Sequence, residues 1–319
     1  MKKLISIGLP VVKKEYFESA LNSALDQTYP SVEIILLNNA DDLSVKNHIA
    51  KIVKKYDGNR IFYYENEFQI PAVENWNKVL SYARGDYFVL FSDDDIYEPD
   101  FLAEMQDLFN KYPNADIAHC RVKIIDGDNN TIGYSPICPV YENVIDFIWH
   151  RFKGFRTQYA SDFMMKTTKL KESGGFVDLP LAWGTDDATW FKLAKQNGIV
   201  YSNKVLCHWR CSNINISRRG DPDLRIKANI TYNKWANDFI SDIKAISEQE
   251  IFQINEIRQL IFKWKRNNII NILMVTSGDG FFSLFKVIQL WIKFRVKYHL
   301  DLIIIIRAAI FKIKKLLFN

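Results

Sequence analysis

The sequence has few cysteines, with four among 319 residues, and they form no paired framework of the kind found in disulfide-rich secreted domains. We therefore expect a reduced, cytoplasmic protein. Cys207 and Cys211 flank His208, but no second ligand pair follows elsewhere in the sequence. A structural zinc site is disfavoured for that reason.

Long apolar runs are also missing. The apolar stretches near the C-terminus are far shorter than the roughly 20 residues that a membrane-spanning helix needs. The basic residues 2 and 3 precede an apolar stretch that is too short for a signal peptide, so we expect residues 4–12 to form a first strand. Internal repeats and low-complexity segments are absent, and 48% hydrophobic with 25% charged residues is the composition of a globular enzyme.

Apolar runs alternate with helical periods through the first hundred residues, a pattern typical of parallel strands joined by crossover helices. The expected strands are residues 4–12, 32–37, 61–64 and 87–91, and the expected helices are residues 15–27, 43–56 and 73–83. Beyond residue 95 the alternation loosens, with a helix near 99–112 and a strand at 117–125. The sequence predicts an α/β fold with a mixed, mainly parallel, Rossmann-like sheet flanked by helices.

From about residue 222 the sequence becomes helical, which predicts an α/β domain at 1–220 and a helical C-terminal region at 221–319. Residues 281–319 contain eight Lys or Arg and one Asp, a net charge of +7, whereas the whole chain carries +5. The polar side chains of 281–298 recur three or four residues apart on an otherwise apolar helix. We expect these basic amphipathic helices to lie on the inner membrane surface and bind anionic lipid.

Two alternatives remain for residues 281–319, a helical cap on the α/β domain and a contact in a homodimer. A nucleic-acid partner is disfavoured, because the basic residues stand among bulky aliphatic side chains.

Polar residues follow two of the expected strands. Asp93, Asp94 and Asp95 come after the apolar run 87–91, and Asn38 and Asn39 follow the strand at 32–37. Three adjacent carboxylates repel one another unless water or a divalent cation neutralises them. Because ligands of open α/β sheets bind outside the carboxyl ends of strands, both segments should face one crevice, where we predict a metal–diphosphate site. An acidic turn that caps the next helix is the alternative.

Several motifs, taken in order, resemble the inverting nucleotide-sugar glycosyltransferases of family 2, which have the GT-A fold. The resemblance covers about residues 4–217. It rests on the first strand at 5–10, the Q-T-Y-P sequence at 27–30, the acidic stretch at 84–100, the G-G-F-V sequence at 174–177 and the T-D-D sequence at 185–187. The acidic stretch is similar to the family's DXD region, and T-D-D is similar to its T-E-D motif. Their shared order and spacing make the joint match specific.

The resemblance implies that Asp93 and Asp95 form the D-x-D pair, with one carboxylate on Mg²⁺ or Mn²⁺ and another on the donor's ribose. The motif fits in two registers, so the assignment stays open. Asp94 is our first choice of metal ligand, and Asp95 and His208 are the further candidates.

The resemblance also implies a set of contacts to the donor nucleotide, made by Pro10, Val12, Glu15, Asn38, Asn39, Asp93 and Arg210. The family has Asp where Asn38 stands. An amide still bonds a pyrimidine edge but brings no charge, so a UDP- or dTDP-sugar is the favoured donor. Arg218 and Arg219 are further candidates for positive charge on the leaving group.

Asp187 matches the last residue of the T-E-D motif, which implies a general base, with Asp186 holding the loop or the acceptor. The same residues fit an ordinary helix start led by Thr185, and both interpretations can hold at once.

We therefore expect a metal-dependent, inverting hexosyltransferase. It would add one sugar to a glycan or glycolipid acceptor in surface polysaccharide synthesis, as a peripheral protein on the cytoplasmic face of the membrane. The Q-x-x-R-W signature of processive members is absent. One alternative is a catalytically inactive, membrane-associated scaffold or sugar-binding protein, which Asn38 and Asn39 leave open. A nucleotidyltransferase would need a glycine-rich loop after the first strand, and residues 9–14 contain no glycine.

Overall fold

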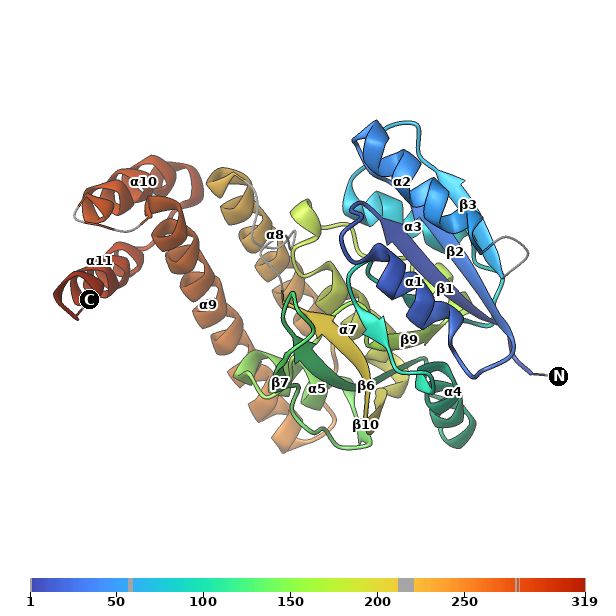
Figure 1. Cartoon of the computed structure of the whole chain (residues 1–319). Coiled ribbons are helices and arrows are strands. Elements are labelled where there is room, and N and C mark those ends of the chain that lie inside the picture. The colour runs from blue at the N-terminus through green and yellow to red at the C-terminus, as the bar shows by residue number, and fades with distance from the viewer. Residues whose placement is uncertain (1, 57–59, 212–220, 279, 281, 319) are drawn as a thin grey trace. The chain divides into compact units, whose positions relative to one another are not determined.

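The computed structural model describes the chain except residues 1, 57–59, 212–220, 279, 281 and 319 (Figure 1). It divides into two compact units. The sheet unit comprises Met1–Asp178 and Thr185–Asn215, and the helical unit comprises Leu179–Gly184 and Ile216–Asn319. The expected domain boundary at residue 220 lies outside the described residues and stays a prediction, as does the contribution of Arg218 and Arg219.

The sheet unit is built on one mixed sheet (Figure 1). Its main strands, in spatial order, are β3 (Ile61–Glu65), β2 (Val32–Asn38), β1 (Ile5–Val11), β4 (Tyr87–Leu90), β9 (Phe163–Lys166), β6 (Ile117–Ile125), β10 (Ile199–Arg210) and β5 (Ile96–Tyr97). The strands from β3 to β4 are parallel, as is the β6–β10 pair, whereas β9 runs antiparallel to both β4 and β6. The short strands β7 (Thr131–Tyr134) and β8 (Tyr141–Glu142) extend β6 and β10.

Helices cover both faces of the sheet, which is why its central strands are apolar at nearly every position. One core joins Ile5, Ile7 and Leu9 of β1 to α1 (Phe17–Leu25), α2 (Leu43–Lys54) and α4 (Phe101–Lys111). On the other face lies α3 (Ala72–Tyr82), which contacts β1 and β2. The remaining helices of this unit are α5 (Val144–Lys153), α6 (Thr167–Glu172) and α7 (Thr185–Asn197). The predicted α/β class is confirmed.

The register of the parallel strands brings the expected polar segments to one edge. Val11 pairs with Asn38, so β1 and β2 end side by side. Gly8 pairs with Leu90, and the chain leaves β4 directly into the acidic residues 93–95. The carboxyl ends of these strands therefore form the crevice edge where open α/β sheets bind ligands.

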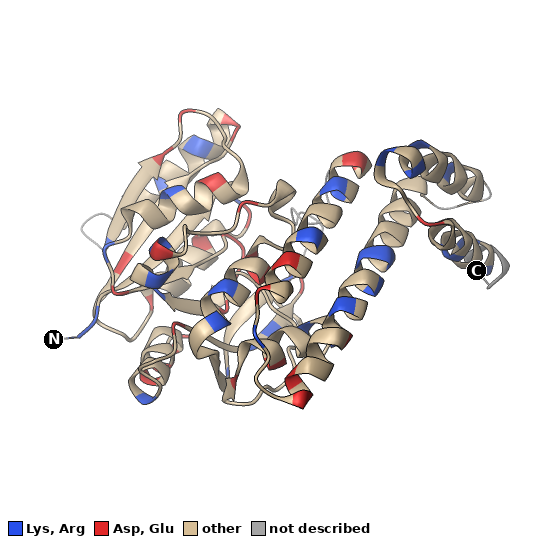
Figure 2. Ribbon diagram, turned by 180° about the vertical axis from the view of Figure 1, so that it is seen from behind, with Lys and Arg blue, Asp and Glu red and all other residues tan. Residues whose placement is uncertain are grey.

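The helical unit contains α8 (Pro222–Ser241), α9 (Glu248–Ser277), α10 (Ser283–Tyr298), α11 (Leu302–Phe318) and the 3₁₀ turn η1 (Pro180–Ala182). Its core joins Ile269 and Leu273 of α9 to Trp291 and Phe294 of α10 and Ile304 of α11. Lys and Arg residues recur along α9 and α10, where the ribbon is blue (Figure 2). Among the described residues, none of the helices combines the length and the apolar character required to cross a bilayer.

A short segment of the helical unit interrupts the sheet unit in sequence. Leu181 and Ala182 have positive φ angles of 59° and 53°, unusual for residues with a Cβ. Gly184 has φ 74°, and a Cβ there would lie 2.4 Å from the ring of Tyr232 on α8. Close packing against Tyr232 therefore requires glycine directly before α7.

We predict that Gly8→Ala destabilises the sheet unit. A Cβ at residue 8 would lie 2.5 Å from Cζ of Phe88 and 2.6 Å from Cγ1 of Val79, both buried side chains. Overpacking of this kind costs about 1–3 kcal/mol, so the midpoint of urea unfolding should fall. Gly133→Ala is the matched control, because its nearest neighbour would be Ile124 at 3.7 Å. Equal midpoints for the two variants would contradict the packing described here.

Candidate active site

Asp93 ties the acidic triplet to the end of β1. Its Oδ2 accepts hydrogen bonds from the backbone N–H groups of Val12 (2.8 Å) and Lys13 (3.1 Å). Burial raises the pKa of Asp93 to about 6, because the attraction of Lys13 does not offset the loss of solvation and the repulsion of Asp94. This carboxylate thus positions the loop that follows Pro10.

Asp95 ties the triplet to the other half of the sheet. The Ser161 hydroxyl donates to Oδ2 at 2.5 Å, and the backbone N–H of Arg210 donates to Oδ1 at 2.9 Å. Burial, reinforced by the charge of Asp94, raises the pKa of Asp95 to about 7.

Asp94 differs from its neighbours because its carboxylate is paired with a lysine side chain. Its Oδ2 is paired with the ammonium group of Lys13, whose Nζ also lies 3.7 Å from Oδ1 of Asp93. Burial opposes the charge of Lys13, but the attraction of Asp93 and Asp94 is larger and raises the pKa of Lys13. The sequence analysis missed Lys13, although a lysine directly after the first strand was a visible signal.

Arg210 is fully buried behind the triplet. Its Nε donates to the backbone carbonyl of Asp94 at 2.8 Å, its Nη1 donates to the carbonyl of Asp126 at 2.9 Å, and its guanidinium lies 4.1 Å from the ring centre of Tyr16. In this arrangement Arg210 positions the acidic backbone, and its expected contact to the donor stays a prediction.

His208 lies beside the triplet on β10, where it pairs in register with Ile96 of β5. Its Nε2 is 2.7 Å from Oε1 of Glu98. Burial lowers the pKa of His208 more than Glu98 raises it, so the ring is neutral at pH 7. A neutral imidazole is the form that binds a metal.

The two asparagines after β2 are buried and hydrogen-bonded within the protein. The Asn38 amide donates to the carbonyl of Lys46 and to the hydroxyl of Tyr63. The Asn39 amide donates to the carbonyl of Ile70 at 3.0 Å, while its Oδ1 accepts from the Ile70 N–H at 2.9 Å. An ionised Asp could not make these donations, which explains physically why amides replace the family's acids here.

The other expected nucleotide contacts lie at the same edge. Pro10 is within β1 and pairs with Leu37, Val12 follows the strand, and Glu15 is exposed in the loop before α1. Their roles toward a donor stay predictions.

Asp186 and Asp187 lie in the first turn of α7, where the helix dipole favours acids. Nε of Arg151 on α5 donates to both carboxylate oxygens of Asp187, at 2.9 and 3.2 Å. Burial and the charge of Asp187 raise the pKa of Asp186 to about 6. Arg151 was missed by the sequence analysis, because no motif marks it.

Asp162 connects the two acidic motifs. It precedes β9, is fully buried, and accepts at Oδ1 from the backbone N–H of Tyr159 at 3.0 Å. Burial raises its pKa well above the usual range, and the charges of both Asp95 and Asp186 raise it further. The residue before it, Ser161, donates a hydrogen bond to Asp95, so Asp162 is adjacent in sequence to a contact of the triplet. An acid directly before a short apolar strand was the signal for Asp162 in the sequence.

The carboxylate oxygens of the triplet are of the type that binds a hard divalent cation. Carboxylate oxygens are the ligands that Mg²⁺ and Mn²⁺ prefer, and the raised pKa values of Asp93 and Asp95 reflect negative charge that a cation would relieve. In the described part of the chain, no three acidic, His or Cys side chains are grouped to hold a metal by themselves. Magnesium often uses one or two carboxylates plus substrate phosphates, and Asp94 with Asp95 fits that smaller set.

Comparison with known proteins identifies relatives of this arrangement. The family model described as glycosyl transferase family 2 matches residues 6–169. A glycosyltransferase of Rickettsia typhi is 25% identical over 206 residues, which are 64% of this chain and 62% of that protein. The dolichyl N-acetyl-alpha-D-glucosaminyl phosphate 3-beta-D-2,3-diacetamido-2,3-dideoxy-beta-D-glucuronosyltransferase of Methanococcus voltae is 24% identical over 206 residues, 62% of this chain and 64% of that protein. The chain thus spans less than two thirds of the length of these relatives.

Two solved structures share the fold. TarS of S. aureus (residues 1–349) in complex with UDP-GlcNAc has a TM-score of 0.64 at 16% identity, and the match covers 86% of this chain and 80% of that one. The mannosyltransferase PcManGT of Pyrobaculum calidifontis in complex with GDP-Man and Mn²⁺ has a TM-score of 0.59 at 15% identity, with coverages of 98% and 88%. The predicted family and GT-A fold are confirmed.

We predict that Asn39→Asp lowers the stability of the protein at pH 7. A carboxylate at residue 39 would face the Ile70 carbonyl without a proton to donate, and a buried unpaired acceptor costs about 1–3 kcal/mol. Such an acid would have a raised pKa, so the deficit should be largest above that pKa and shrink as the pH falls toward 5. Melting temperatures at both pH values measure this.

The control is Asn114→Asp, at an exposed position. If Asn39→Asp and this control had the same melting temperature at pH 7, the hydrogen bond that the Asn39 amide donates would not contribute to stability.

Proposed function

Because the chain belongs to glycosyl transferase family 2, we propose that it is a metal-dependent, inverting glycosyltransferase that moves one sugar from a nucleotide-sugar donor to a lipid-linked glycan acceptor. The observation that carries this proposal is the hydrogen bond from Ser161 to Asp95, because it joins the triplet to the segment of Asp162, a buried acid whose pKa the charges of Asp95 and Asp186 both raise. A donor site and a base site in one cleft are what a single displacement at the anomeric carbon requires.

The donor would bind at the carboxyl edge of β1, β2 and β4, with its nucleotide near Asn38, Asn39 and Asp93. TarS, with UDP-GlcNAc, and the mannosyltransferase, with GDP-Man, support a nucleotide-sugar donor in this fold. We favour a UDP- or dTDP-sugar, and the UDP-GlcNAc complex of TarS supports a pyrimidine nucleotide. The Asn38 and Asn39 amides, which are engaged within the protein, would act by holding the neighbouring loops.

Asp94 is the proposed principal metal ligand, with Asp95 and His208 as further candidates. Asp93 and Asp95 hold backbone N–H groups in place, whereas Asp94 is bound by the flexible side chain of Lys13. A bound Mg²⁺ or Mn²⁺ would neutralise the departing nucleoside diphosphate. Lys13, once released from Asp94, would supply a second positive charge to the same leaving group.

Asp187 is the proposed general base. The guanidinium of Arg151 donates to both of its carboxylate oxygens and fixes its orientation. The acceptor hydroxyl would lose its proton to Asp187 as its oxygen bonds the anomeric carbon and the bond from that carbon to the diphosphate oxygen breaks. Attack from the face opposite the leaving group inverts the anomeric configuration. Asp186 would hold the acceptor or the loop.

The helical unit is proposed to bring the enzyme to the cytoplasmic face of the membrane, as a peripheral protein of surface polysaccharide synthesis. Helix α10 exposes Phe285, Ile292 and Val296, and α11 exposes Ile306 and Ile310, all on helices that also carry Lys and Arg. Large exposed apolar side chains beside basic ones are typical of interfacial helices. The name of the Methanococcus relative, which specifies a dolichyl-linked phosphate acceptor, supports a lipid-linked acceptor.

We predict that Asp187→Asn lowers transfer by roughly 10²- to 10⁴-fold while donor affinity is retained, because the amide keeps the shape but cannot take the proton. Release of nucleoside diphosphate measures turnover, and calorimetric titration of the donor measures affinity. Asp178→Asn, at an exposed position of the same unit, is the control. Unchanged turnover in Asp187→Asn would remove Asp187 from the mechanism. If the wild-type protein turned over none of the donors, the result would favour the inactive scaffold.

A second prediction concerns the cation. Mn²⁺ with UDP should raise the melting temperature of the wild-type protein, and Asp94→Asn should abolish that gain, whereas the exposed Asp107→Asn should not. Lys13→Met should tighten Mn²⁺ binding without nucleotide, because it removes the ammonium group that pairs with Asp94.

Mn²⁺ binding should also strengthen between pH 5 and pH 8, as Asp93 and Asp95 lose their protons near pH 6 and pH 7. A Mn²⁺ response that Asp94→Asn leaves intact would refute the ligand assignment.

A further inference from the structure

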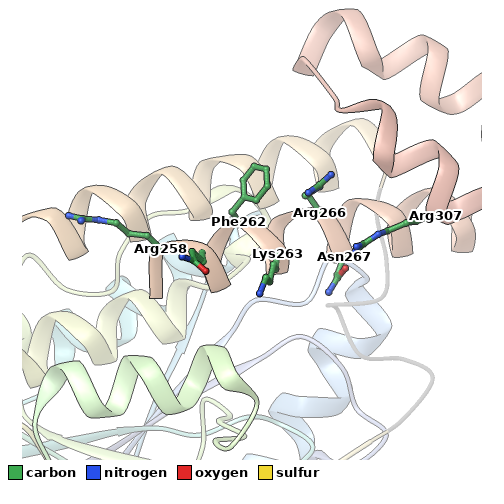
Figure 3. A pocket seen from close by; sticks show the side chains of 7 residues that line it. Arg258, Phe262, Lys263, Arg266, Asn267 and Arg307 are labelled. Atoms are coloured by element: carbon green, nitrogen blue, oxygen red, sulfur yellow. The ribbon is translucent and has the colours of Figure 1, made fainter. Parts of the chain in front are cut away.

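A basic cavity of about 570 Å³ lies within the helical unit, between α9 and α11 (Figure 3). Four of the residues that line it are cationic, namely Arg258, Lys263, Arg266 and Arg307. Phe262 and the amide side chain of Asn267 also line it. None of these residues belongs to the proposed active site, and no sequence motif marked them.

The charge of the basic cavity is poorly balanced. Of the described residues that line it none is acidic, and α9 has no Asp or Glu from Arg258 to its end at Ser277. Within the described residues the one acid paired with a lining cation is the half-exposed Asp301, whose Oδ2 is 3.5 Å from Nε of Arg266. The cavity therefore carries an excess of positive charge, which a bound anion would neutralise.

The fold does not require these cations. Helix α9 packs into the protein through Ile257, Ile261, Ile269 and Leu273. Arg258 and Lys263 are exposed on α9, and Arg307 is exposed on α11. Arg266 is held more firmly, with its guanidinium 5.0 Å from the ring centre of Phe262. Arg258, Lys263 and Arg307 are therefore open to solvent and do not serve the packing of the helices.

The surroundings of the basic cavity indicate the class of anion. Guanidinium groups match phosphate oxygens in geometry and charge. Arg307 stands between the exposed Ile306 and the apolar exposed side chain of Ile310 on α11, and Phe262 is exposed at the cavity itself. A phosphate attached to a hydrocarbon tail satisfies both the cations and the apolar rim, whereas a free phosphate satisfies only the cations.

We propose that the basic cavity binds the phosphate headgroup of a membrane lipid. This deepens the proposed membrane location, on which it rests, by naming the residues and the ligand chemistry of the helical unit. A site on α9 lies outside the amphipathic segment 281–319, so it would add headgroup recognition to the interfacial insertion of α10 and α11.

The test uses the full-length protein and vesicles of phosphatidylcholine, with and without phosphatidylglycerol. We expect the wild-type protein to sediment with the phosphatidylglycerol vesicles and to be released by salt. The variant Arg258→Gln/Lys263→Gln/Arg307→Gln should lose binding by roughly 10- to 100-fold, since surface cations act nearly additively on anionic membranes. Arg266 is left in place because it contacts Phe262 and Asp301.

The matched control removes three exposed lysines elsewhere in the helical unit, Lys227→Gln/Lys234→Gln/Lys244→Gln. Equal losses in the two triple variants would overturn the proposal, because only net charge would then matter. Absence of wild-type binding to phosphatidylglycerol vesicles would overturn it as well. Inorganic diphosphate that stabilises the wild-type protein and displaces it from vesicles at equal phosphate concentration would assign the cavity to a free anion instead.

Release of nucleoside diphosphate by the same variants separates this proposal from the enzyme mechanism. The Arg258/Lys263/Arg307 variant should turn over donor with a soluble acceptor or water at the wild-type rate, and its melting temperature should match that of the control. A failed vesicle experiment with intact turnover would remove the lipid site and leave the glycosyltransferase assignment in place.

Discussion

The constraint on which the sheet unit depends is the burial of several carboxylates in one region. Asp93 and Asp95 fasten the triplet to two different parts of the sheet, and the charges of Asp95 and Asp186 both raise the pKa of the buried Asp162. Burying this much negative charge is costly, and the pKa values of these acids are raised accordingly. Lys13 and Arg151 offset part of the repulsion, one at each end. In the proposed mechanism, a bound cation and substrate would relieve the rest of the repulsion between these carboxylates.

The buried amides and Arg210 differ in role from the buried acids. Asn38 and Asn39 spend their hydrogen bonds on neighbouring loops, and Arg210 spends its own on the backbone around the triplet. These residues shape the crevice. In the proposed mechanism the chemistry takes place at the acids, and the specificity for the nucleotide would depend on the loops that the amides hold.

Much of the fold could be predicted from the sequence, because strands buried on both faces are apolar at nearly every position and their polar ends are conspicuous. The acidic run at 93–95 was marked by its place after an apolar strand, whereas 185–187 was marked by its resemblance to the family's T-E-D motif. The antiparallel insertion of β9 between β4 and β6 could not be predicted, since four residues carry no signal of their neighbours. Lys13, Arg151 and Asp162 were missed because their importance comes from partners 24 to 81 residues away in sequence.

The segment Leu179–Gly184 has a practical consequence for anyone dissecting this chain. It packs with α8 of the helical unit, through Gly184 against Tyr232, yet it continues directly into the helix that carries Asp187. Cutting the polypeptide after β10 would strip this inserted stretch of its support and leave its left-handed backbone angles unsupported. The helical unit thus supports the segment that leads into the helix of Asp187, the proposed base, so a fragment designed to test that role must retain α8.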